Sequence, residues 1–148
     1  MNTTIIAGSL DIVAAFTQAY VGNKIPPDIV LKYIASGMFG NKALEGALDM
    51  ILAGLFFHFT IAFACVTVFF MVYPKFKILH HRIVLNSLII ALTAWSITHL
   101  VIIPLSKIGP QPFGFKSALT AIGILFLCVG LPIAYSARQF FKKKAHGI

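Results

Sequence analysis

The stretch LDMILAGLFFHFTIAFACVTVFFMVY, residues 48–73, decides the fold of this chain. After Asp49 it contains no Asp, Glu, Lys or Arg, and it closes just before Pro74. A helix needs about 20 mainly apolar residues to cross the hydrocarbon core of a bilayer. The stretch therefore predicts a transmembrane helix that spans the membrane once.

Three further apolar stretches of similar length cover residues 4–22, 83–103 and 117–137. The whole chain of 148 residues is 59% hydrophobic and only 11% charged, whereas a soluble domain carries about 25% charged residues. Its mean hydropathy is +0.92. These values predict an all-α polytopic membrane protein, with residues 1–148 forming a single integral membrane domain in contact with lipid. They exclude a secreted disulfide scaffold.

The distribution of lysine and arginine predicts how the chain is oriented in the membrane. Four spans place both termini and the loop between the second and third spans on one side. Seven basic residues fall on that side and five on the other: Lys75, Lys77, Arg82, Arg138, Lys142, Lys143 and Lys144 against Lys24, Lys32, Lys42, Lys107 and Lys116. Because positive residues gather on the cytoplasmic side, we expect a bacterial inner (plasma) membrane protein with cytoplasmic N- and C-termini. The basic residues then reflect topology, and no nucleic-acid partner is predicted.

The segment between the first two spans, residues 23–46, has the residue pattern of a helix. It opens with Pro26 and Pro27, after which apolar side chains recur at helical spacing: Ile29, Val30, Tyr33, Ile34 and Phe39. This pattern favours an amphipathic helix at the outer membrane interface or a re-entrant segment, broken near Gly37 and Gly40. A surface loop with one helical turn is the simpler alternative.

Three ionisable side chains interrupt the predicted spans: Asp11, His58 and His99. Each such group costs about 2.5–3.5 kcal/mol to insert, so each requires a reason. With the predicted topology they lie at three depths, and a carboxylate and two imidazoles in a line are able to pass a proton near neutral pH. The sequence thus indicates a channel or transporter for protons or another small solute, supported by three further polar residues, Gln18, Asn86 and Thr93.

The alternative is a membrane scaffold or accessory subunit without catalytic activity, in which the same polar groups only bond one helix to another. The chain contains no His-Glu-x-x-His, Gly-x-Ser-x-Gly, Walker or dinucleotide-binding motif, so we predict no enzyme, no cofactor and no metal. Small-residue helix faces leave little room for a pore inside one bundle. Either role therefore predicts a homo-oligomer.

Several landmarks, taken together, resemble the YagU-like family of bacterial inner-membrane proteins, whose function is unknown. They are spread over most of the chain: Pro26-Pro27, Gly54, His58, Pro74-Lys75-Phe76-Lys77, His99, Pro104-Leu105, Pro112 and Arg138. Members often place another histidine in the last span, whereas residues 123–128 here contain none. The family name implies a link with acid tolerance, which would suit proton handling. The resemblance implies no substrate and no catalytic residue.

Overall fold

The computed structural model describes residues 2–75, 82–109 and 114–145, and their side chains as far as Lys142. Within these ranges the secondary structure is helical throughout, without a strand. Four helices are long and apolar enough to cross a membrane: Asn2–Asn23, Leu48–Lys75, Ile83–Leu105 and Phe115–Lys142. The predicted all-α polytopic fold is confirmed, and each predicted span begins and ends within about five residues of these bounds. The chain is an integral membrane protein.

Two of the four spans are continuous α-helices, and two contain a wider turn. α1 (Asn2–Asn23) is regular, and α4 (Leu48–Val72) continues into a short 3-10 turn, Tyr73–Lys75. In the third span, α5 (Ile83–Ser96) is followed by a π-helical segment, Ile97–Ile102, and by α6 (Ile103–Leu105). In the fourth, a π-helical segment, Phe126–Gly130, joins α7 (Phe115–Leu125) to α8 (Leu131–Ala145).

A proline explains each π-helical segment. Pro104 and Pro132 both follow their segment by two residues. A proline ring clashes with the carbonyl four residues earlier, and those carbonyls belong to Leu100 and Cys128, which lie inside the widened turns. The wider turn leaves room for the ring, so the helix continues. Pro104 therefore does not end the third span, which runs to Leu105.

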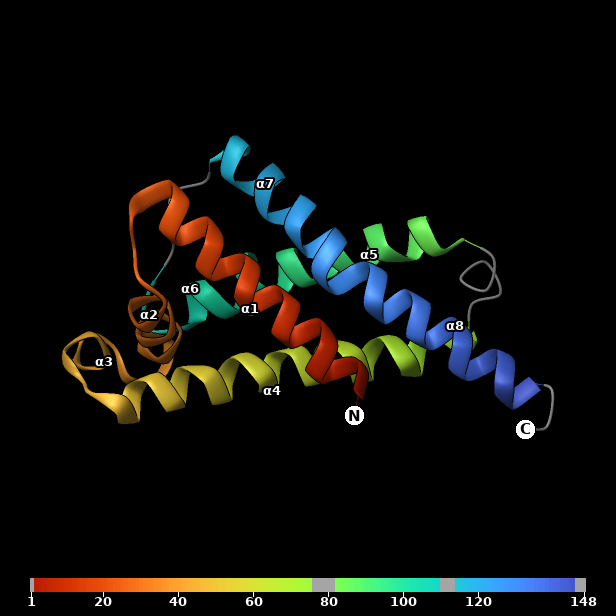
Figure 1. Ribbon diagram of the computed structural model, residues 1–148, viewed down its shortest axis with the longest axis horizontal. Coiled ribbons are helices and arrows are strands. Elements are labelled where there is room, and N and C mark those ends of the chain that lie inside the picture. The colour runs from red at the N-terminus through yellow and green to blue at the C-terminus, as the bar shows by residue number, and fades with distance from the viewer. Residues whose placement is uncertain (1, 76–81, 110–113, 146–148) are drawn as a thin grey trace.

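The four spans alternate in direction. α1 and α5 run toward the end of the bundle that carries α2 (Pro27–Phe39) and α3 (Lys42–Glu45), whereas α4 and α7–α8 run away from it (Figure 1). Figure 1 views α2 nearly along its own axis, so α2 lies across the long axis of the bundle. The segment between the first two spans is thus a formed helix and not a loop with one turn.

α2 is docked closely against α4. A side chain at Gly54 of α4 would collide with the backbone carbonyl of Leu31, so the absence of a Cβ allows the two helices to touch. Lys107 N–H donates a 2.9 Å hydrogen bond to the Gly37 carbonyl, which ties α2 to the end of the third span. α2 ends at Phe39, and Gly40 makes the turn at φ +68°, a conformation that favours glycine. Gly37 lies within the helix and does not break it.

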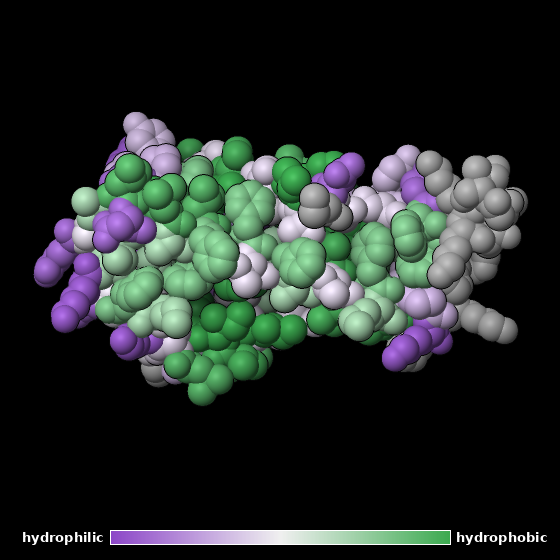
Figure 2. Space-filling model, turned by 90° about the horizontal axis from the view of Figure 1, so that it is seen from below, coloured by the Kyte–Doolittle hydropathy of each residue, from purple (hydrophilic) through white to green (hydrophobic). Residues whose placement is uncertain are grey.

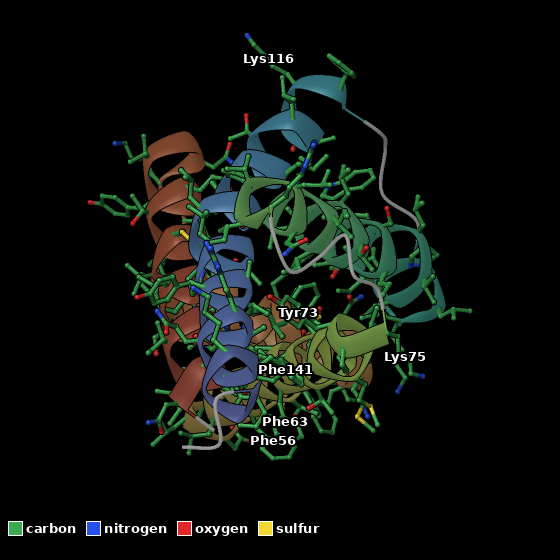
Figure 3. All side chains as sticks on the ribbon, turned by 90° about the vertical axis from the view of Figure 1, so that its right-hand side faces the viewer. Phe56, Phe63, Tyr73, Lys75, Lys116 and Phe141 are labelled. Carbon is green, nitrogen blue, oxygen red and sulfur yellow. The ribbon has the colours of Figure 1, made fainter. Side chains whose placement is uncertain are left out.

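The tightly packed core lies where α4, α5 and α8 meet, with one contribution from α1. It consists of Ala7, Val66, Phe69, Tyr73, Ile90, Val129, Ile133, Ala134 and Ala137. The rings of Tyr73, in the 3-10 turn that follows α4, and Phe141, in α8, stack with centroids 5.2 Å apart (Figure 3). At this end of the bundle, aromatic side chains therefore hold the spans together.

The outside of the spans is apolar. Phe56 and Phe63 are 68% and 55% exposed and point away from the bundle on α4 (Figure 3). Figure 2 shows hydrophobic residues covering the middle of this face, with most of the hydrophilic residues gathered toward its two ends. Such a belt is stable against hydrocarbon rather than water.

Candidate functional site

A cavity of about 480 Å³ lies between α1, α2 and α4 and reaches inward to α5 and the fourth span. Most of its wall is apolar, with side chains such as Ile12, Ile34 and Phe57. α1 contributes Gly8, Asp11 and Ala15, which follow one another at helical spacing. A face of α1 that carries small and polar residues therefore lines an internal space along part of its length.

Asp11 and His58 are brought together at this cavity. Both side chains line it, Asp11 from α1 and His58 from α4. In the described part of the chain, no hydrogen bond reaches the Asp11 carboxyl, and no lysine or arginine lines the cavity with it. The pair therefore combines an acid and an imidazole beside a space large enough for a small molecule.

His58 bridges α4 and α1. Its Nε2 lies 2.8 Å from the Gly8 carbonyl oxygen. Because a carbonyl only accepts, Nε2 carries the hydrogen, and Nδ1 is the proton acceptor of the neutral ring. A Cβ at Gly8 would come within 2.8 Å of the Phe59 ring. Gly8 thus lets α1 approach α4 closely enough for this bond.

Two of the hydroxyl groups in the wall are hydrogen-bonded within their own segments. Thr60 Oγ1 donates to the Phe56 carbonyl at 2.8 Å, and Ser106 Oγ donates to the Ile103 carbonyl at 2.7 Å. Hydroxyls that bond their own helix have less capacity left for a ligand. The Cys65 thiol also lines the cavity. Among the residues that line the cavity, Asp11 supplies a carboxyl group and His58 an imidazole.

His99 lies elsewhere. Its side chain is exposed in the π-helical segment Ile97–Ile102, where its ring stacks on Trp95 with centroids 4.9 Å apart. Its Nδ1 is 3.3 Å from the Trp95 carbonyl oxygen. It does not line the cavity. The structure brings together two members of the predicted Asp11, His58 and His99 line and leaves the third on the surface of the bundle.

The three supporting residues also lie outside the cavity wall. Gln18 and Thr93 are exposed on α1 and α5. Asn86 is 1% exposed, on α5 next to Ser87, where Gly130 brings the fourth span against the α5 backbone. Asn86 therefore belongs to a contact between helices and not to the cavity.

The sequence did not reveal how much α2 contributes. Five of its residues line the cavity: Val30, Tyr33, Ile34, Gly37 and Met38. Their spacing places them on one face of the helix. Three of them, Val30, Tyr33 and Ile34, belong to the apolar pattern that the sequence predicted. Tyr33 is 43% exposed, and its partial burial raises the pKa of its phenol, which therefore stays protonated at neutral pH. An amphipathic pattern shows that a face is covered, but not what covers it.

Within the described residues, no three His, Cys, Asp or Glu side chains gather as a metal site would require. His80, His81 and His146 lie outside the described residues.

No family model, curated protein or solved structure matches the chain. The resemblance to the YagU-like family stays a prediction.

Proposed function

We propose that this protein carries a small, mainly apolar cation across the membrane in exchange for protons, and that the cavity between α1, α2 and α4 is where the cation binds. The observation that carries the proposal is the Asp11 carboxyl, which faces the cavity beside His58 without a hydrogen bond. A lipophilic amine fits this chemistry, because its ammonium group would pair with the carboxylate and its body would contact the apolar wall.

The Asp11–His58 pair couples the binding of the cation to the release of a proton. With the carboxyl ionised and the imidazole neutral, the pair carries one negative charge and attracts a cation. When a proton binds at Nδ1 of His58 or at the carboxyl, the net charge of the pair falls to zero and the attraction is lost. One proton would therefore displace one cation, which is the requirement for exchange in a site that holds either but not both.

The scaffold role is the second candidate, and one observation favours it. The 2.8 Å bond from His58 to the Gly8 carbonyl joins α4 to α1, as a purely structural histidine would. This bond uses Nε2 and leaves Nδ1 and the Asp11 carboxyl unexplained. An experiment that separates transport from folding distinguishes the two roles.

The test uses the full chain in sealed liposomes that contain a pH-sensitive dye, with an outward gradient of a lipophilic amine. We expect Asp11→Asn to reduce proton movement by at least about tenfold while the protein stays folded, because Asn keeps the size of the side chain but does not titrate. His99→Gln is the matched control, since His99 is exposed outside the cavity. It should behave as the parent protein does.

A second pair of variants tests the cavity itself. Ala15 lines the cavity, whereas Ala64 is exposed on the outer face of α4. Ala15→Leu should block amine movement by filling the space, and Ala64→Leu should not. If all four variants transport the amine as fast as the parent protein, or if the parent itself shows no flux, the transport role is wrong. The scaffold role would then be the better explanation.

A further inference from the structure

A second hollow, of about 490 Å³, lies between the start of α5 and α8, at the end of the bundle opposite α2. Six residues line it: Arg82, Ile83, Val84, Leu85, Leu88 and Arg138. Two arginines, one directly before α5 and one in α8, thus share a wall that is otherwise apolar. This hollow is separate from the cavity that contains Asp11.

Arg138 is incompletely satisfied by the protein. Its Nε atom is buried and has no hydrogen-bond acceptor among the described residues. A buried donor without an acceptor costs about 1–3 kcal/mol, and more when it carries charge. Arg82 is exposed and lines the same hollow. Two arginines in this arrangement are suited to an acceptor that carries negative charge.

The chain itself supplies no carboxylate side chain at this end. Its four acidic residues are Asp11, Asp28, Glu45 and Asp49. Asp11 lines the other cavity, and the remaining three lie in α2, in α3 and at the start of α4. Because this count comes from the whole sequence, it includes the residues that the structure leaves undescribed. An anion that pairs with these two arginines is therefore not an acidic side chain of this chain.

The hollow continues into a surface suited to a hydrocarbon chain. Val84 and Leu88 are 68% and 41% exposed and follow each other at helical spacing on α5. They extend from the arginines along the span toward the middle of the bundle. The first turn of α5 also lines the hollow, and the amides at a helix start favour a negative group. The combination is a cationic head site above an apolar groove.

We propose that this hollow binds one phospholipid with a net negative headgroup. Its phosphate accepts hydrogen bonds from Arg82 and Arg138, and one acyl chain lies along Val84 and Leu88. Basic pockets between spans are a recurrent way to hold anionic lipids. The bound lipid supplies the acceptor that Arg138 Nε lacks and fastens α5 to α8. This role does not depend on transport through the cavity.

The test is native mass spectrometry of the full chain in a nonionic detergent, titrated with phosphatidylglycerol or with phosphatidylcholine of the same acyl chains. We expect one phosphatidylglycerol to be retained per chain, with clear preference over phosphatidylcholine. Arg82→Gln/Arg138→Gln should weaken phosphatidylglycerol binding by about tenfold or more, because both cationic partners are lost. Lys107→Gln/Lys116→Gln removes two charges near the other end and is the matched control.

Two further measurements keep the outcome decisive. Arg82→Gln alone alters only an exposed side chain, so it should fold even where the double variant does not, and it should weaken binding at least about threefold. Glycerol phosphate, added in large excess, should not displace the lipid. Displacement by glycerol phosphate would assign the hollow to a soluble phosphate compound. The proposal would be overturned by such displacement. It would also be overturned if the two lipids bound equally well, or if the lysine control lost as much phosphatidylglycerol binding as the arginine variant.

Discussion

The core between α4, α5 and α8 and the cavity between α1, α2 and α4 are built from the same classes of residue, yet one is filled and the other is open. In the core, Ala134 and Ala137 are 0% exposed, and Gly130 lies directly against the Ser87 backbone. Around the cavity, Ala15 and Ala62 line about 480 Å³ of space. Small residues bring two backbones together in the first region and leave room for a ligand in the second.

The charges of the two regions differ as well. The core cluster is apolar apart from the hydroxyl of Tyr73, and the polar side chains buried beside it, Asn86 and Ser87, carry no charge. The cavity contains Asp11 and His58. A charged group in a span is retained where it faces protein or a water-filled space. The core therefore stabilises the bundle, whereas the cavity contains the ionisable groups that are able to bind a ligand.

The largest expected effect is on stability, in the core. In Gly130→Ala the new methyl group would collide with the Ser87 backbone, so the two spans must separate. Overpacking of this kind costs about 1–3 kcal/mol. We expect a lower midpoint of thermal unfolding in detergent, measured by circular dichroism.

Gly123→Ala is the control for this variant. Gly123 also lies in the fourth span, but among the described residues no atom outside the adjoining helix backbone lies within 4 Å of the position of its missing Cβ. This change should leave the midpoint unchanged or raise it slightly. If both variants lower the midpoint equally, the contact between Gly130 and Ser87 is not what holds these spans together.

The smallest expected effect concerns polar residues outside both regions. Gln18→Leu and Thr93→Val alter exposed side chains that do not line the cavity. We expect each change to alter the free energy of unfolding by no more than about 0.5 kcal/mol and to leave amine flux intact. Loss of flux in either variant would extend the functional region beyond the cavity.

Much of the fold follows from the sequence because lipid imposes one strict requirement. A span needs enough consecutive apolar residues, with every backbone amide bonded within its own helix. Residues 48–73 satisfy this requirement on their own. The π-helical segments before Pro104 and Pro132 do not follow in the same way, because a proline is also able to end a helix.

The candidate site follows from the sequence only in part. Asp11 and His58 stand out because ionisable groups are costly in a span. That reasoning treats His99 in the same way, and it does not reveal that His99 is exposed beside Trp95. Which way a side chain faces depends on how the helices are rotated against each other. Contacts such as that of Gly54 with the Leu31 backbone set this rotation.

The most direct test of the account is to measure protons released when a lipophilic amine binds to the purified protein in weakly buffered detergent solution. We predict about one proton released per amine bound at a pH where the Asp11–His58 pair still holds a proton, because the two compete for one site. Asp11→Asn should abolish both binding and release, and His99→Gln should change neither. Amine binding without proton release, or undiminished release from Asp11→Asn, would contradict the claim that cation and proton share this cavity.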